Sequence, residues 1–195
     1  MATLFWIFSL LSVALVFVDA KSHQKPVCTS GRTALTLGFD DLDVPVNSLT
    51  AVVPWPYHDF IISRTMRTDK HMPLVNTTGN VYYGNTASSL PNVIVGSGVS
   101  EALVIEQQAT PRNNTFLLRS IVMTAVFINQ GMFIQTVQGG VVTQSITVNL
   151  SAGVRTLVTI PDPTCADQII IGCTVQTPDG CANIAYDDIA VCYKP

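Results

Sequence analysis

The sequence contains few charged residues. Asp, Glu, Lys and Arg make up 12% of its 195 residues, whereas a typical soluble domain contains about 25%. Thr, Val, Ile, Ser, Asn and Gln take their place, a composition that is typical of a secreted β-protein rather than of a helical cytosolic enzyme. With 10 basic and 13 acidic residues, the chain also lacks the basic surface of a nucleic-acid-binding protein.

Common catalytic motifs are also missing. The chain has no Gly-x-Ser-x-Gly motif to present a nucleophilic serine, and no Cys-x-x-Cys motif that would indicate a metal site. Glu101 and Glu106 are the only glutamates. On one strand they would face opposite sides of the sheet, which does not suit the paired carboxylates of a glycosidase. We therefore predict that the protein is not an enzyme.

One apolar run stands at the N-terminus, and no second run is long enough to cross a membrane. Residues 4–18 are almost wholly apolar and are followed by Ala20 and a polar segment. This pattern predicts a secretory signal peptide at residues 1–20 and an extracellular mature protein. Because the segment begins without Lys or Arg, an uncleaved anchor is the alternative. Residues 21–195 are long enough for one domain with a hydrophobic core.

Cysteines are concentrated near the C-terminus. In an oxidising compartment they favour disulfides, and an odd number leaves one thiol free or paired with another chain. If the terminal strands pair, a bridge between the first and last cysteine is favoured, and Cys173–Cys181 could close a short loop. The five cysteines are Cys28, Cys165, Cys173, Cys181 and Cys192.

Three Asn-x-Ser/Thr sequons fit a secreted protein. They begin at Asn76, Asn113 and Asn149. Glycosylation at these positions requires a eukaryotic secretory route and exposure at the surface.

Short β-forming segments alternate with turn residues along the mature chain. We expect residues 63–80 to form a long surface loop and find no convincing helix. Short strands separated by turns every 8–12 residues predict an all-β jelly-roll sandwich of two antiparallel sheets. The predicted strands are residues 34–39, 49–53, 57–62, 81–83, 103–105, 116–128, 132–137, 141–150, 154–160, 169–175 and 184–192.

Two Asp-Asp pairs lie near the ends of the mature chain, Asp40-Asp41 and Asp187-Asp188. In an extended strand successive side chains point to opposite faces, so we expect one Asp of each pair to face inward. If the terminal strands lie side by side, the carboxylates converge, and Ca²⁺ with its oxygen ligands would relieve their repulsion. The sequence therefore predicts a structural calcium site at these four residues. The alternative is that they accept loop N–H bonds without a metal.

The order of these motifs resembles that of galactose-binding-domain-like jelly rolls related to carbohydrate-binding modules. The likeness covers most of residues 34–193. It implies a structural Ca²⁺ near the chain ends, with Asp41 and Asp188 as ligands. The motifs are Phe39-Asp40-Asp41-Leu42, Tyr57-His58-Asp59-Phe60, Pro91-Asn92, a strand at 116–126 and Tyr186-Asp187-Asp188-Ile189.

Exposed loops with aromatic residues are the candidate ligand surface. Sugar sites place an aromatic ring against the apolar face of the sugar and polar groups against its hydroxyls, and binding residues concentrate on loops. We predict a non-enzymatic module that binds glycan or cell-wall material. The alternatives are an effector-type protein that binds a host or partner protein, and a structural cell-surface protein. The candidate ligand residues are Trp55, Tyr57, His58, Asp59, Tyr82, Tyr83 and Asn92.

Overall fold

The computed structural model describes residues 28, 31–46, 48, 51–65, 70–89, 91–96, 101–108, 115–174 and 183–195. The predicted signal peptide, Cys181 and Asn113 lie outside these ranges, so the predictions about them stay predictions. The described residues contain no helix whose length and hydropathy would let it cross a membrane.

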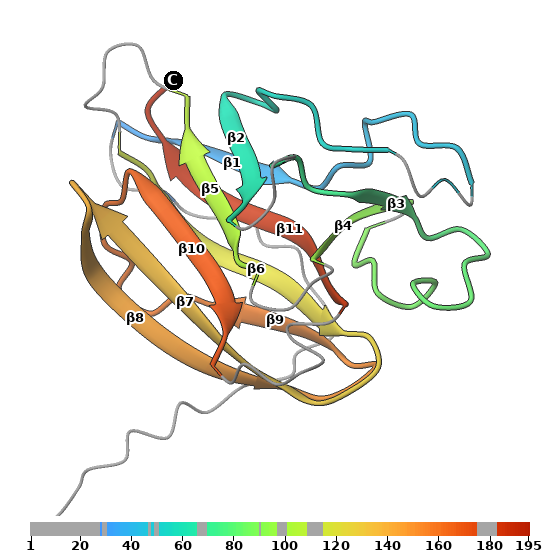
Figure 1. The fold of residues 1–195 in the computed structure, drawn as a ribbon. Helices are drawn as coiled ribbons and strands as arrows, with labels where there is room; N and C mark the ends of the chain where they lie inside the picture. The colour runs from blue at the N-terminus through green and yellow to red at the C-terminus, as the bar shows by residue number, and fades with distance from the viewer. Residues whose placement is uncertain are drawn as a thin grey trace, which may run out of the picture.

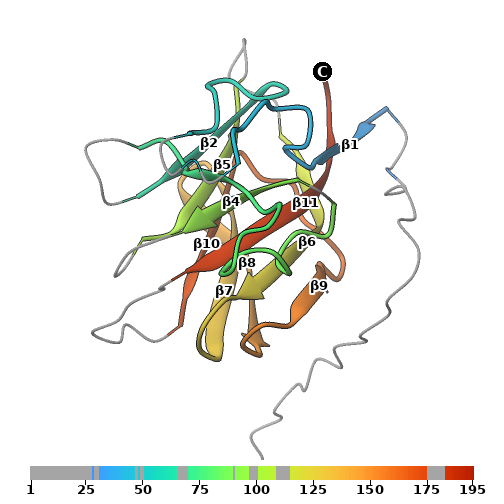
Figure 2. The ribbon, with the colours of Figure 1, turned by 90° about the vertical axis from the view of Figure 1, so that its right-hand side faces the viewer.

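Two antiparallel sheets, which we call sheet A and sheet B, pack face to face (Figures 1 and 2). Sheet A has the order β3-β4-β11-β6-β9, with β1 also paired to β11, and sheet B has the order β2-β5-β10-β7-β8. Strands distant in sequence are therefore neighbours, as in a jelly roll, and the predicted all-β jelly-roll sandwich is confirmed. Sheet A contains β1 (Thr33–Leu37), β3 (Leu74–Asn76), β4 (Asn92–Gly96), β6 (Leu117–Ala125), β9 (Arg155–Thr159) and β11 (Ile184–Tyr193). Sheet B contains β2 (Phe60–Arg64), β5 (Leu103–Gln107), β7 (Gln130–Gln138), β8 (Val141–Leu150) and β10 (Gln168–Cys173).

The core lies between the two sheets. Along β9, Thr156 and Val158 are buried while their neighbours are exposed, which is the period of two expected of a strand with one solvated face. β7 alternates in the same way over most of its length, whereas β4 and β11 are buried on both faces. The largest fully buried side chains include Phe39, Phe60 and Tyr186.

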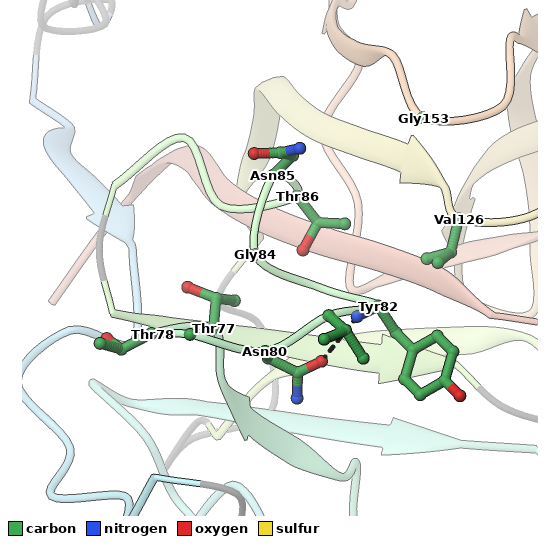
Figure 3. Close-up of a pocket in the computed structure, with 11 residues that line it drawn as sticks. Thr77, Thr78, Asn80, Tyr82, Gly84, Asn85, Thr86, Val126 and Gly153 are labelled. Atoms are coloured by element: carbon green, nitrogen blue, oxygen red, sulfur yellow. Dashed lines mark hydrogen bonds between the residues drawn. The ribbon is translucent and has the colours of Figure 1, made fainter.

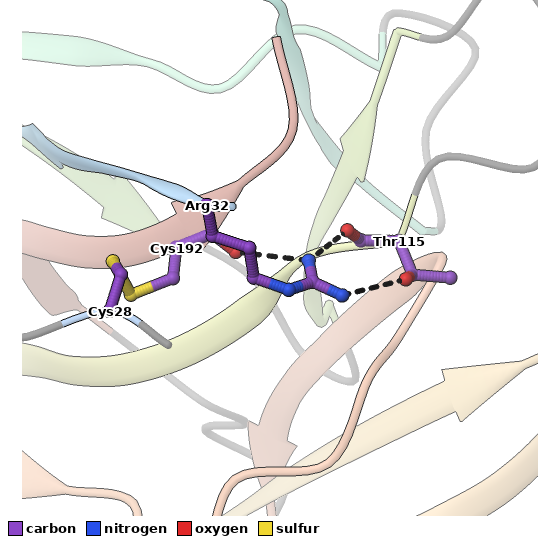
Figure 4. Close-up of a disulfide and its surroundings, with 4 residues drawn as sticks. All are labelled: Cys28, Arg32, Thr115 and Cys192. Carbon is purple, nitrogen blue, oxygen red and sulfur yellow. Dashed lines mark hydrogen bonds between the residues drawn. A yellow bond between two sulfur atoms is a disulfide. The ribbon is translucent and has the colours of Figure 1, made fainter. Parts of the chain in front are cut away.

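The two ends of the domain are joined. β1 pairs antiparallel with β11, from Thr33 opposite Tyr193 to Leu37 opposite Ile189. A disulfide links Cys28 to Cys192 across 164 residues of sequence, which confirms the predicted bridge. Beside it, Arg32 donates hydrogen bonds to the carbonyl and hydroxyl of Thr115 (Figure 4). The strand pair and the covalent link together close the sandwich.

The prediction for residues 63–96 was wrong in three places. Leu74 and Val75 of β3 are buried inside the predicted surface loop, and β4 was not predicted at all. Conversely, residues 81–83 form turns rather than a strand. The short apolar runs of β3 and β4 pair with each other, from Leu74 opposite Ile94 to Asn76 opposite Asn92. Such long-range pairing overrides weak local patterns.

The β3–β4 loop (residues 77–89 and 91) folds back over the outer face of sheet A. Ala87 and the half-buried Tyr83 of the loop pack on Val93, Val95 and Ala185 of β4 and β11. This satellite cluster is separate from the core between the sheets. The loop therefore becomes a second layer on sheet A.

Candidate functional site

Carboxylates from both chain ends gather around Gly38. A Cβ atom on Gly38 would lie 3.3 Å from Asp188 Oδ1 and 3.9 Å from Asp40 Oδ2. Asp187 joins them through Ser88, whose hydroxyl oxygen is 2.9 Å from Asp187 Oδ2 and 2.7 Å from Asp188 Oδ2. Three of the four predicted metal ligands therefore lie near one another.

The predicted alternation of the Asp pair in β11 was wrong. Asp187 and Asp188 both approach Ser88 instead of pointing to opposite faces. The pairing of β11 with β6 shifts register between Asp187 and Ala190, and Asp188 has φ of +43°. A β-bulge re-aims side chains in this way, and it cannot be read from periodicity.

Asp187 ties the β3–β4 loop to sheet A. Its Oδ2 accepts hydrogen bonds from the backbone N–H groups of Ser88 at 2.8 Å and Ser89 at 3.2 Å. Its Oδ1 accepts one from the N–H of Asp188 at 2.8 Å. Burial, and next the neighbouring Asp188, raise the pKa of Asp187 to about 6. The arrangement is a buried loop anchor next to other carboxylates.

Asp41 faces a different set of partners. Tyr57 donates its phenol hydrogen to Asp41 Oδ1 at 2.6 Å, and His58 Nε2 lies 3.1 Å from Asp41 Oδ2. The hydrogen bond from Tyr57 is the main reason that the pKa of Asp41 is lowered. Burial, followed by the hydrogen bond to Asp41, raises the pKa of Tyr57. Asp41 therefore braces the segment that carries Tyr57 and His58.

The four aspartates do not form one ligand set for calcium. Asp41 is committed to Tyr57 and His58, and both oxygens of Asp187 accept N–H bonds. Within the described ranges, no three His, Cys, Asp or Glu side chains are grouped so that they could hold a metal ion. The residues therefore do not fit the predicted four-aspartate site, and calcium binding itself stays a prediction.

The predicted ligand residues at positions 55–59 include two, Trp55 and Tyr57, whose side chains contact other parts of the fold. Trp55 is 39% exposed, donates its indole N–H to Ile62 O at 2.8 Å and stacks on His71 with ring centroids 4.0 Å apart. Tyr57 is buried, whereas His58 and Asp59 are exposed. These residues stay candidates for a ligand, but the pocket below is not built from them.

Two of the three remaining predicted ligand residues are partly or wholly enclosed. Asn92 is fully buried, and its side-chain amide donates to Phe39 O at 3.0 Å and Leu42 O at 2.8 Å. Tyr83 is half-buried, and its hydroxyl donates to Asn183 Oδ1 at 3.2 Å. Burial raises the pKa of Tyr83. Both residues hold the scaffold in place.

A pocket of about 590 Å³ opens under the β3–β4 loop (Figure 3). Tyr82 is the only predicted ligand residue among its lining residues. Val126 and Gly153 contribute from the loops after β6 and β8, so three connections far apart in sequence meet here. The lining consists of Thr77, Thr78, Gly79, Asn80, Val81, Tyr82, Gly84, Asn85, Thr86, Val126 and Gly153.

An exposed aromatic pair stands beside the pocket. Tyr82 is 62% exposed and Phe127 is 51% exposed, and their rings meet edge to face with centroids 5.7 Å apart. The backbone around Tyr82 is fixed by Asn80, whose Oδ1 accepts the N–H of Tyr82 at 2.9 Å and of Tyr83 at 3.1 Å. Sequence reasoning missed Phe127 and the Asn and Thr residues. The Asn-, Thr- and Gly-rich composition of residues 76–86 was the available signal.

Two of the three sequons lie in the described residues. Asn149 is exposed on β8, as glycosylation requires. Asn76 is buried in β3, and its Nδ2 donates to Val44 O at 2.8 Å. A glycan on that nitrogen would replace one of its two hydrogens at a position where the residue is only 7% exposed. The fold therefore does not favour glycosylation at Asn76, which stays a prediction.

The remaining cysteines divide into a bonded and a free one. Cys173 is disulfide-bonded, and its predicted partner, Cys181, lies outside the described residues. Cys165 is a free, half-buried thiol, and Arg32 lies 3.2 Å from its sulfur. The odd thiol predicted from the cysteine count is therefore Cys165.

No protein-family model matches the chain, and no curated protein does. Among solved structures, it is similar to the family 32 carbohydrate-binding module of NanJ from C. perfringens, solved in complex with galactose. The TM-score is 0.39 and the identity 14%, over 69% of this chain and 93% of that chain. A carbohydrate-binding module is thus among the similar structures, as the sequence resemblance predicted.

A second similar structure is the enzymatically active domain of tailspike protein 4 from bacteriophage CBA120. The TM-score is 0.29 and the identity 12%, over 70% of this chain and 18% of that chain. At these TM-scores neither alignment informs the site. The fold assignment rests on the sheet order, and the function is argued from the pocket.

Proposed function

We propose that the protein is a secreted, non-enzymatic module that binds neutral carbohydrate in the pocket under the β3–β4 loop. The observation that carries the proposal is the chemistry of the lining. Hydroxyl and amide side chains surround the pocket, the exposed ring of Tyr82 stands at its edge, and none of the lining residues in the described part of the chain is charged. Neutral sugars present the same combination of hydroxyl groups and apolar faces.

Polar groups of the pocket remain available for sugar hydroxyls. Asn85 is exposed, and its side-chain amide makes no hydrogen bond within the described residues. Asn80 uses its Oδ1 for the loop backbone, which leaves its two amide hydrogens to donate outward. The hydroxyl of the exposed Thr78 can both donate and accept. Amide and hydroxyl groups held on a bonded loop suit recognition of a polyol.

A glycan array of neutral polysaccharides, followed by calorimetric titration, tests the proposal. We expect Tyr82→Ala to weaken binding about three- to tenfold, because an aromatic contact is worth roughly 0.5–1.5 kcal/mol. Val141→Ala is the control, since Val141 is 66% exposed on β8 and outside the pocket lining. Absence of binding to any neutral glycan, or equal affinity in Tyr82→Ala, would reject the proposal.

A partner protein is the second candidate. Exposed apolar side chains include Val81 in the pocket lining, 88% exposed, and Phe127 and Ile128 directly after Val126, 51% and 44% exposed. Clustered exposed apolar groups favour protein interfaces. Ile128 is absent from the pocket lining, so Ile128→Asp separates the two functions. The substitution should abolish a protein complex and leave sugar binding within about twofold, since surface changes are worth about ±0.5 kcal/mol.

Calcium binding and secretion complete the proposal. A structural ion at Asp40 and Asp188 predicts a lower melting temperature in chelator for the wild type, and no chelator effect in the double variant Asp40→Asn, Asp188→Asn. An unchanged melting temperature in the wild type would reject the ion. Secretion predicts that the extracellular protein begins at Lys21, which N-terminal sequencing determines.

A further inference from the structure

The pocket-forming loop is attached to sheet A mainly through its second half. Tyr83 bonds to Asn183, and Thr124 of β6 donates to Thr86 O at 3.4 Å. Arg155 of β9 donates to Ala87 O at 2.5 Å. Ser88 and Ser89 follow directly and bond to Asp187. The first half, which carries Asn80 and Tyr82, is bonded at its start, where Thr77 donates to Pro91 O. It is joined to the second half by the bond from the N–H of Gly84 to Asn80 O.

Asp187 makes the densest of these attachments. One buried oxygen, Oδ2, accepts two consecutive loop N–H groups and the hydroxyl of Ser88. The carboxylate is 1% exposed and lies on β11, opposite Val122 of β6. A pair of consecutive N–H groups held by one carboxylate oxygen fixes the backbone direction at Ser88 and Ser89. Water cannot replace a partner at a site this enclosed.

We propose that Asp187 is a positioning residue for the pocket: its carboxylate holds the β3–β4 loop in the conformation that presents Asn80 and Tyr82. This inference rests on the proposed function for the identity of the ligand, but not for the anchoring of the loop. Asp187 is absent from the pocket lining. Its effect on binding is therefore exerted through the loop.

Three variants separate positioning from general stability. Asp187→Ala removes the acceptor of the Ser88 and Ser89 N–H groups, whereas Asp187→Asn keeps one oxygen that can accept the same two N–H groups. Val191→Ala is the matched control, because Val191 is fully buried in the same strand and pairs with Leu35 and Leu118, far from the loop in register. It destabilises the core without touching the loop bonds.

The first readout needs no ligand. Hydrogen exchange is measured in chelator for residues 77–89, relative to β7 and β8, at a temperature where all variants are folded. Asp187→Ala should lose protection in the loop selectively, Asp187→Asn should retain most of it, and Val191→Ala should not change the ratio. Equal loop protection in Asp187→Ala and the wild type overturns the inference. If Asp187→Ala does not fold, Ser88→Ala replaces it in this measurement, because it removes only the hydroxyl bond to Asp187 and Asp188. Loss of loop protection in Ser88→Ala then supports the inference, and unchanged protection overturns it.

The second readout is affinity for galactose and cellobiose as neutral sugar probes. Asp187→Ala should bind about tenfold more weakly, which corresponds to losing one charge-assisted hydrogen bond. Asp187→Asn should recover to within about threefold of the wild type, and Val191→Ala should bind normally. An equal loss in Val191→Ala overturns the positioning role. If neither sugar binds the wild type but the loop loosens in Asp187→Ala, the anchor stands and the proposed ligand class is rejected.

Discussion

Asn92, fully buried at the start of β4, joins this strand to the turn at residues 39–42. Its amide donates to Phe39 O and Leu42 O, so Asn92→Leu leaves one buried and one part-buried carbonyl group without these donors. We expect the free energy of unfolding to fall by about 2–4 kcal/mol, measured by urea denaturation. Asn149→Leu, at an exposed position on β8, should change it by about 0.5 kcal/mol at most. Similar losses in both variants would contradict the structural role of Asn92.

Asp187 gives the protein a specific dependence of stability on pH. Its pKa is raised to about 6 in the fold, above its value near 3.9 in an unfolded chain. A raised pKa means that the stabilising contribution is complete below about pH 4 and is lost as the pH rises through 6. We expect the free energy of unfolding to fall by up to about 3 kcal/mol between pH 4 and pH 7. Asp187→Asn should remove most of this slope in denaturant titrations.

The carboxylate of Asp41 acts in the opposite direction and in a different range. Its pKa is lowered by Tyr57, so its contribution is present above about pH 4 and is lost only as the pH falls further. The loss of stability due to Asp41 therefore occurs below about pH 4, and the loss due to Asp187 occurs above it. A curve that rises from pH 4 to pH 7, or one unchanged in Asp187→Asn, would contradict the assignment to Asp187.

At the scale of elements, β7 and β10 meet at a close contact. Gly172 pairs with Phe133, and a Cβ atom at Gly172 would lie 2.6 Å from Cζ of the Phe133 ring. Gly172→Ala should therefore destabilise the protein by about 1–3 kcal/mol. In a double-mutant cycle with Phe133→Leu, the cost of the alanine should shrink, because the ring that it strikes is gone. Equal costs in both backgrounds would show that the ring is not the obstacle.

The elements also show what the sequence could predict. Residues 141–150 alternate clearly, and β8 has those same bounds. The β3 and β4 strands were not predicted, because each is short and gains its stability from pairing with the other across a loop. The pocket was not predicted either, because Tyr82, Val126 and Gly153 come from three connections that are far apart in the sequence. Local residue patterns predict which segments form strands, whereas the pocket depends on which loops the fold brings together.

At the scale of the molecule, the aspartate pairs link two features. One is the pairing of the terminal strands, which closes the sandwich, and the other is the attachment of the β3–β4 loop. The sequence predicted that β1 and β11 pair, and this is confirmed. The bulge at Asp188 then directs two carboxylates toward the β3–β4 loop. The predicted calcium site and the observed loop anchor therefore draw on the same residues. Chelator and Asp187 variants distinguish them, since only an ion responds to chelation.

The Cys28–Cys192 disulfide should dominate the stability of the whole domain. It closes a loop of 164 residues, and loop entropy alone gives about 5 kcal/mol for a ring of that size. Cys28→Ser with Cys192→Ser should therefore lower the free energy of unfolding by several kcal/mol, measured by denaturation without reductant. Cys165→Ser is the control, because Cys165 is a free thiol and closes no loop. If the double variant unfolds at the same denaturant concentration as Cys165→Ser, then pairing of β1 with β11, and not the disulfide, holds the chain ends together.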